Sequence, residues 1–138
     1  LYEREPDAVQ TDATIIAGQL AEEPPPFECL LRFDDDEPVG FALFFHNYST
    51  WRGRRGLYLE DLFVPPEHRG RGHGLALFRA VAAIAVQRGC PRMEWSVLDW
   101  NTPAIDFYRA LGAVSMDGWT TFRLADEALV AASRDDAP

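Results

Sequence analysis

A glycine-rich turn between an apolar strand and an apolar helix constrains the fold of this chain more than any other feature. Residues 57–64 read as a strand, and Pro65-Pro66 ends it because proline cannot donate to a sheet ladder. Residues 69–74 read Arg-Gly-Arg-Gly-His-Gly, and residues 75–88 form a helical pattern that is apolar nearly all round. This order predicts a largely buried helix packed against a sheet, as in an α/β protein.

The other segments complete a mixed sheet with helices on its faces, an α/β or α+β class. Polar and proline-rich stretches separate them, including an acidic turn at 34–38 and a loop at 47–56. We expect, in order, a helix carrying Ile15, Ile16 and Leu20 and capped by Thr11 or Asp12, strands at 27–33, 39–45 and 57–64, a helix at 75–88, a strand at 93–98, a helix capped by Asn101 or Thr102 and closed by Gly112, and a strand at 119–124.

Length and charge narrow the class of protein. The 138 residues predict a single domain, residues 1–138, and the net charge of −9 would repel nucleic acid but attract a small cationic molecule. We expect a cytoplasmic protein, because the chain has neither an apolar run of membrane-spanning length nor an N-terminal leader pattern. Cys29 and Cys90 are expected as free thiols, and neither they nor the histidines show the spacing of metal ligands, so no metal is expected.

The glycine-rich turn predicts a phosphate cradle. Glycines allow a close backbone approach, and the first N–H groups of the following helix lack internal partners and carry partial positive charge. A P-loop is excluded because no Lys-Ser or Lys-Thr pair follows the glycines. A dinucleotide fingerprint fits less well, since the third glycine comes one residue early and several strands precede the turn, although Glu94 lies where its ribose acid would be. A plain tight turn also remains open.

The sequence resembles the GNAT superfamily of N-acetyltransferases, and within it the spermidine/spermine (diamine) acetyltransferase branch. The cofactor signature Gln/Arg-x-x-Gly-x-Gly/Ala matches residues 69–74 at every fixed position. Further resemblance lies in Leu-Tyr-Leu-Glu-Asp-Leu-Phe-Val at 57–64, in Trp-Asn-x-Pro-x-Ile-x-Phe-Tyr at 100–108, in Gly112-Ala113 and in Tyr2-Glu3. The resemblance implies the GNAT acyl-CoA N-acyltransferase fold. Family members begin with a strand and a long first helix, and two alternatives stay open here: that strand and part of that helix are absent, or they precede residue 1.

By this resemblance, acetyl-CoA is the co-substrate and the strand at 57–64 bulges. Its backbone would pair with the pantetheine amides, the turn would hold the pyrophosphate, and the thioester would lie where two parallel strands splay apart. The residues implied in cofactor binding are Leu62, Phe63, Val64, Arg69, Gly70, Arg71, Gly72, His73, Gly74, Leu75, Asn101, Ala104 and Tyr108.

The resemblance also implies direct attack of a small primary amine on the acetyl group. Glu60 would take a proton from the amine, directly or through water, and Tyr108 would return one to the departing thiolate. Strand alternation predicts that Glu60 shares a face with Tyr58 and Leu62, while Asp61 lies on the other face unless a bulge intervenes. The residues implied in amine binding are Tyr2, Glu3, Trp51, Glu60, Asp61, Glu94, Trp95, Ser96 and Trp119.

The substrate class that the resemblance implies is a polyamine, a diamine or a lysine-like amino acid, and a homodimer is expected on the same ground. Two alternatives stay open. One is acetylation of a protein N-terminus or lysine, which would need an open groove. The other is a module that binds acyl-CoA without catalysis, in which Tyr108 would have no measurable role.

Overall fold

The computed structural model describes residues 13–134 and divides the chain into two compact units, Leu1–Asp106 and Phe107–Pro138. The first unit holds a four-stranded sheet in the order β1-β2-β3-β4. Its strands are β1 (Glu28–Asp34), β2 (Glu37–Ser49), β3 (Arg54–Phe63) and β4 (Met93–Glu94). The first three are antiparallel, and β4 pairs with β3 in parallel, so the sheet is mixed as predicted.

The helices are α1 (Ala13–Leu20), α2 (His73–Gln87), α3 (Thr102–Ala110) and α4 (Asp126–Ala132), with a 3₁₀ turn at Pro66–His68. The helix expected around Ile15 is confirmed, but its expected caps, Thr11 and Asp12, lie outside the described residues. The hairpin is confirmed with longer strands than predicted. No helix in the described part of the chain has the length and apolar character needed to cross a membrane.

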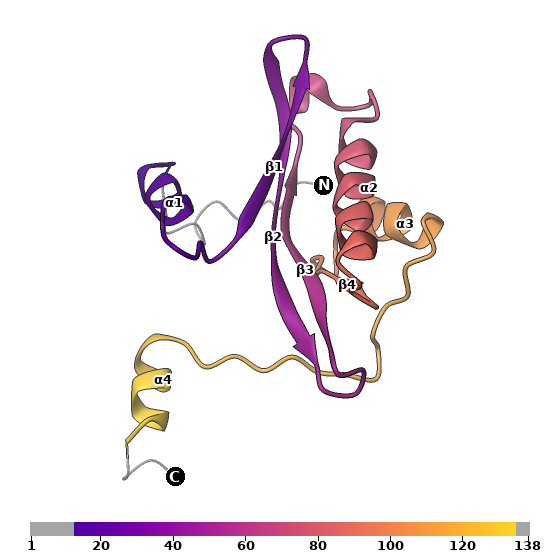
Figure 1. Ribbon diagram of the computed structural model, residues 1–138. Helices are drawn as coiled ribbons and strands as arrows, with labels where there is room; N and C mark the ends of the chain where they lie inside the picture. Colours follow the sequence, from indigo (N-terminus) through magenta and orange to yellow (C-terminus); the bar gives the residue numbers. More distant parts are fainter. Residues whose placement is uncertain (1–12, 135–138) are drawn as a thin grey trace. The chain divides into compact units, whose positions relative to one another are not determined.

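The core of the first unit forms where α2 lies along one face of the sheet (Figure 1). Leu77, Val81 and Ala85 recur every four residues and form the buried stripe of α2. They pack against buried strand residues, Ala42, Phe44, Leu57, Leu59 and Leu62. The prediction of a largely buried helix is wrong in part, because Val86, one of the apolar residues on which it rested, is 77% exposed.

A bulge in β3 changes which side chains face the helix. Phe44 pairs with Leu59, but Leu43 pairs with Asp61, so Glu60 is an extra residue in β3 that the register with β2 skips. Leu59 and Leu62 therefore face α2 although three positions separate them. Tyr58 and Asp61 share the opposite face, since their partners Phe45 and Leu43 alternate with Phe44. The predicted face shared by Glu60, Tyr58 and Leu62 is wrong, because the inserted residue shifts the alternation by one.

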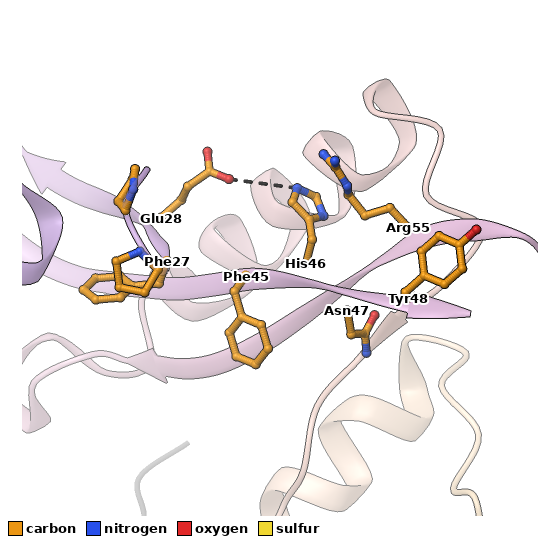
Figure 2. A pocket seen from close by; sticks show the side chains of 9 residues that line it. Phe27, Glu28, Phe45, His46, Asn47, Tyr48 and Arg55 are labelled. Carbon is orange, nitrogen blue, oxygen red and sulfur yellow. Dashed lines mark ion pairs between the residues drawn. The ribbon is translucent and has the colours of Figure 1, made fainter. Parts of the chain in front are cut away.

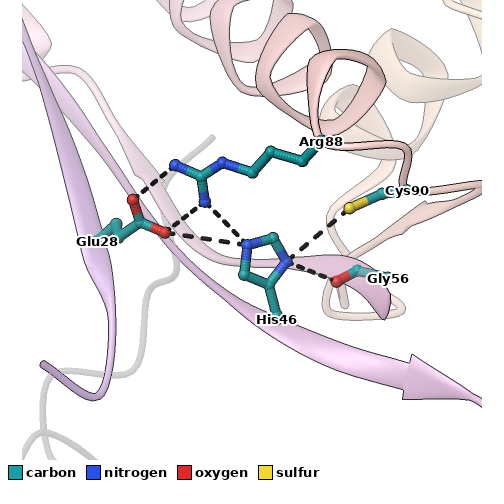
Figure 3. Close-up of polar contacts among 5 residues, drawn as sticks. All are labelled: Glu28, His46, Gly56, Arg88 and Cys90. Carbon is teal, nitrogen blue, oxygen red and sulfur yellow. Dashed lines mark hydrogen bonds and ion pairs between the residues drawn. The ribbon is translucent and has the colours of Figure 1, made fainter. Parts of the chain in front are cut away.

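A polar network fastens the C-terminal end of α2 to the sheet (Figure 3). The guanidinium of Arg88 donates to both carboxylate oxygens of Glu28, at 2.6 and 2.8 Å, and to Nε2 of His46 at 2.8 Å. The pKa of Glu28 is lowered, chiefly by the hydrogen bond from Arg88. Both charged side chains are partly exposed, so the pair stabilises the fold only modestly, by about 0.2–1 kcal/mol.

The second unit carries the C-terminal half of α3 and then α4. Gly112, with φ of +95°, follows α3 as expected of a residue that ends a helix. Residues 119–124 form no strand, so that prediction is wrong. A strand needs a neighbour to satisfy its backbone, and the described part of this unit contains no other strand. The short helix α4 was not foreseen.

The last strand of the sheet is also shorter than predicted. The expected strand at 93–98 pairs with β3 only through Met93 and Glu94. Residues 95–98 follow β4 and are not part of a strand. The side chains of Met93 and Trp95 still pack against the core, which accounts for the apolar alternation that suggested a full strand.

Candidate active site

The glycine-rich turn directly precedes α2 and has a left-handed backbone at two positions. Gly70 has φ of +80° and Gly72 has φ of +82°, a region that side-chain-bearing residues rarely adopt. A Cβ atom added at either glycine would meet no atom within 4 Å. Glycine is therefore required here by the shape of the backbone, and the surface over the turn is open to a ligand.

The amides of this turn remain available. Among the described residues, no acceptor takes the backbone N–H groups of residues 70–75, and the first helical bond runs from Ala76 N to Gly72 O at 3.0 Å. These N–H groups sit at the positive end of the fifteen-residue helix α2. Open backbone, unpartnered donors and a helix N-terminus together suit a phosphate group.

The two arginines of the turn behave differently. Nε of Arg69 donates to the carbonyl oxygen of Val64 at 2.8 Å, and its guanidinium carbon lies 5.9 Å from the ring centre of Phe63. Arg69 therefore braces the turn against the end of β3. Arg71 is exposed, and within residues 13–134 it forms no ion pair, so its charge faces solvent over the turn.

The parallel strands β3 and β4 stay paired for only two residues. Leu57 pairs with Met93 and Tyr58 with Glu94, and Leu57 N donates to Arg92 O at 3.1 Å. The bulge at Glu60 lies within β3, two residues after Tyr58, and the ladder with β4 has ended by that point. The predicted bulge is thus present, and the pairing stops where the resemblance places the thioester.

The side chains that follow the bulge belong to the core. Leu62 is buried in the core, and Val64 packs against it. The ring of Phe63 lies 5.8 Å from that of Phe41 on the face away from α2. Cofactor binding through these three residues is left to their backbone, as the resemblance implies.

Tyr58, Asp61 and Ser96 lie toward the face of the sheet opposite α2. The hydroxyl groups of Tyr58 and Ser96 are hydrogen-bonded at 2.8 Å. Partial burial raises the pKa of the Asp61 carboxyl above its ordinary value near 3.8, although the residue as a whole is exposed. Glu60, the bulge residue, is exposed. The first unit therefore brings two acids and two hydroxyls near the end of the β3–β4 ladder.

Other residues predicted to bind the amine are already engaged by protein groups. The carboxylate of Glu94 accepts a hydrogen bond from the amide of Asn47 at 3.3 Å, and Nε of Arg92 lies 3.2 Å from the same oxygen. The ring of Trp95 packs edge-on against Phe78 of α2 at 5.2 Å. Through these contacts, Glu94 and Trp95 hold the end of β4 against its neighbours in the first unit. Trp51 is 88% exposed, in the turn between β2 and β3.

Asn101 is the residue that caps α3. Its side-chain oxygen accepts a hydrogen bond from the backbone N–H of Ala104 at 3.3 Å, which satisfies one of the free amides of the first turn. Ala104 itself is fully buried. The choice between Asn101 and Thr102 as the cap is thereby settled in favour of Asn101.

Two predicted site residues belong to the second unit, and two lie outside the description. Tyr108 is 8% exposed, and its ring meets that of Phe107 at 5.3 Å in an edge-to-face arrangement. Trp119 is largely exposed. Tyr2 and Glu3 lie outside the described residues.

A hollow of about 540 Å³ lies at the other end of the sheet, beside the start of β3 (Figure 2). Glu28, His46, Asn47, Tyr48 and Arg55 contribute its polar lining. It is wide open, and none of the predicted site residues lines it. The glycine-rich turn follows the opposite end of β3, so this hollow is no part of the predicted cofactor site.

The structure also places a thiol beside an imidazole, a pairing that the sequence did not indicate. Sγ of Cys90 lies 3.9 Å from Nδ1 of His46 (Figure 3). Nδ1 also lies 2.9 Å from the carbonyl oxygen of Gly56, which can only accept, while Nε2 faces the Arg88 guanidinium, which can only donate. The proton therefore sits on Nδ1, and His46 cannot act there as the base for a cysteine nucleophile. Both cysteines are free, as expected.

The chain matches the sequence model of the Acetyltransferase (GNAT) family over residues 1–113. It belongs to the GNAT acetyltransferase family. It is 37% identical to a thialysine N-epsilon-acetyltransferase from Bos taurus, over 93% of this chain and 81% of that protein. It is 42% identical to an L-ornithine N5-acetyltransferase from Arabidopsis thaliana, over 72% of this chain and 44% of that protein.

Solved structures show the same fold. An integron cassette protein from the mobile metagenome of V. cholerae superposes with a TM-score of 0.78 and 25% identity, over 90% of this chain and 79% of that one. The expected GNAT fold, the acetyltransferase activity class and the use of an acyl-CoA by the family are thereby confirmed.

Sequence reasoning missed two polar residues near the site, Arg32 and Tyr58, and it missed the contact of Asn47 with Glu94. Arg32 is a single arginine on a hairpin strand far from the turn in sequence, so no local pattern points to it. Asn47 was assigned to a loop, but β2 continues through it to Ser49. Tyr58 could have been found by placing a bulge at Glu60, which shifts Asp61 onto its face.

Proposed function

We propose that this GNAT acetyltransferase moves an acetyl group from acetyl-CoA to the primary amine of a small cationic substrate, such as a lysine-like amino acid, a diamine or a polyamine. The observation that carries the proposal is the run of unpartnered amides opening α2, which follows the end of β3 beyond the point where its parallel pairing with β4 stops, at Tyr58 and Glu94.

The residues of the turn suit coenzyme A. Its phosphates would take the amides of residues 70–75, where the open space over Gly70 and Gly72 leaves room. The backbone of residues 62–64 would receive the pantetheine arm. When bound, the cofactor supplies an acetyl thioester, an acyl group activated toward an amine.

The chain's own residues must manage two protons. An aliphatic amine with a pKa near 10.4 is only about 0.1% neutral at pH 7, so a base that accepts its proton aids attack. Glu60 is exposed at the bulge, where a carboxylate can accept that proton directly or through water. With a thioester bound, the hydroxyl of Tyr108 would supply a proton to the departing sulfur, the role that the resemblance implies.

The substrate class follows from charge and from the relatives. The chain carries a net charge of −9, and Asp61 offers a carboxylate on the face of Tyr58 and Ser96. The bovine and plant relatives are acetyltransferases of thialysine and ornithine, amino acids with a side-chain amine. A cationic amine of this size is therefore the substrate we propose.

A panel of amines tests the proposal. Thialysine, lysine, ornithine, spermidine, putrescine and an N-terminal peptide are each supplied with acetyl-CoA, and release of the free thiol is followed. We expect a kcat/KM for at least one small diamine or diamino acid that exceeds the peptide value tenfold or more. A higher value for the peptide would favour a protein-directed enzyme, and binding of acetyl-CoA without turnover of any amine would favour a binding module.

A further inference from the structure

His73, the first residue of α2, has its imidazole in the core-facing stripe of the helix. It lies four residues before Leu77 in the series Leu77, Val81, Ala85, and it is 8% exposed. Its Nδ1 accepts a hydrogen bond from Nε of Arg32 at 3.3 Å. Because a guanidinium N–H can only donate, the imidazole proton is on Nε2, which is buried and has no partner among the described residues.

Arg32 reaches this position because of the alternation along β1. Glu28, Leu30 and Arg32 point toward α2, and they meet it at different places. Glu28 binds Arg88 at the C-terminal end, Leu30 packs against the core, and Arg32 meets His73 at the N-terminal end. The arginine is thus brought to the glycine-rich turn by tertiary structure alone.

The position of Arg32, beside the N-terminus of α2, is electrostatically unfavourable when no anion is bound. Arg32 is exposed, and within residues 13–134 only its Nε has an acceptor, so its two terminal nitrogens have none. A cation at a helix N-terminus faces the positive end of the helix dipole. A buried imidazole donor without a partner adds a further cost. An anion bound at the turn would offset the first cost, since a guanidinium forms a strong paired hydrogen bond with phosphate.

We infer that Arg32 is a further phosphate-binding residue of the cofactor site, and that His73 is the positioning residue that orients its guanidinium. The inference rests on the proposed function, because the anion is a phosphate of coenzyme A. Arg32 supplies Nη–H donors from β1 in addition to the backbone amides of residues 70–75.

The test compares Arg32→Gln with Arg55→Gln. Arg55 is also exposed and lies on the same sheet, but far from Arg32. Arg32 pairs with Gly40 of β2 and Arg55 pairs with Tyr48 of β2. Eight residues separate these two partners, a distance of about 27 Å along a strand. Dissociation constants are measured by calorimetry for coenzyme A, 3′-dephospho-coenzyme A and pantetheine, which lacks phosphates. Thermal unfolding confirms that both variants fold.

We expect Arg32→Gln to weaken coenzyme A binding at least fivefold and to leave pantetheine binding unchanged, while Arg55→Gln changes neither more than twofold. The same loss with the 3′-dephospho form places Arg32 on the diphosphate, and a smaller loss places it on the 3′-phosphate. Unchanged affinity in Arg32→Gln, with normal binding by the wild type, overturns the inference alone. A wild type that binds no coenzyme A overturns the proposed function as well.

His73→Phe tests the positioning role, because phenylalanine fills the buried space without accepting the bond from Arg32. We expect it to weaken coenzyme A binding but not pantetheine binding, with little further loss when combined with Arg32→Gln. Equal losses for coenzyme A and pantetheine would show a merely structural role for His73.

Discussion

At the scale of the residue, Asp61 is the acid whose ionisation the fold opposes. Burial raises the pKa of its carboxyl above the ordinary value near 3.8, so the charged form is disfavoured in the folded state. Its ionisation therefore costs stability at neutral pH, and the cost disappears as the pH falls through the raised pKa. A cationic amine beside Asp61 would restore a partner for this charge.

We predict that Asp61→Asn raises Tm at pH 7 by roughly 1–3 °C, because it removes a partly buried charge. The gain should shrink as the pH is lowered toward 4, where the wild-type carboxyl takes up its proton. Asp36→Asn, in the exposed hairpin turn, is the control and should leave Tm unchanged. Thermal scans of the three proteins across this pH range check the prediction, and a gain that grows on acidification would contradict it.

The face of the sheet on which Asp61 lies could not be predicted from the sequence. Alternation assumed one residue per step through Glu60, and it therefore placed Leu62 on the face of Tyr58. A bulge is a property of the pairing between β2 and β3, and nothing in the residues 59–61 marks which one is inserted. The acids were found from the sequence, whereas the face that each occupies required the register of both strands.

At the scale of the element, the strand, turn and helix from 57 to 87 were predicted best. Pro65-Pro66, three glycines and an apolar stripe are local signals, and each corresponds to an observed boundary or buried face. The strand at 119–124 failed because a strand depends on a neighbour that local alternation does not supply. The missing signals were non-local for the shortened β4 and for this last segment.

The glycine-rich turn carries the clearest prediction for an element. Gly72→Asp forces a side chain into a left-handed backbone, which costs about 1–2 kcal/mol, and places a negative charge at the proposed phosphate site. Gly53→Asp is a matched control, because Gly53 has φ of +62° in the exposed turn before β3 and open space around it.

Both variants should lose similar Tm, while Gly72→Asp alone weakens coenzyme A binding, by at least tenfold in calorimetry. Gly72→Ala keeps the strain without the charge and should lose less affinity than the aspartate. Equal affinity in wild type and Gly72→Asp would show that the turn does not hold the phosphates.

At the scale of the whole molecule, the predicted machinery is divided between the two compact units. The turn, the bulged strand and the acids Glu60 and Asp61 belong to Leu1–Asp106, while Tyr108 belongs to Phe107–Pro138. Family membership could be inferred from sequence because its motifs are continuous segments. The contribution of Arg32 could not, because 41 residues separate it from its partner His73.

This division predicts that chemistry and cofactor binding can be separated by one substitution. Tyr108→Phe removes only a hydroxyl from a buried ring that already packs against Phe107, so folding and coenzyme A affinity should be retained. General acid catalysis typically contributes about a hundredfold or more to a rate. Loss of the proton donor for the departing thiolate should therefore lower kcat at least tenfold.

Tyr48→Phe, at an exposed tyrosine of β2, is the control and should keep the wild-type rate. Steady-state rates with the best amine of the panel, measured from pH 6 to 10, check this. A Tyr108→Phe enzyme with the wild-type rate at every pH would remove Tyr108 from the mechanism and leave the cofactor cradle of the first unit untouched.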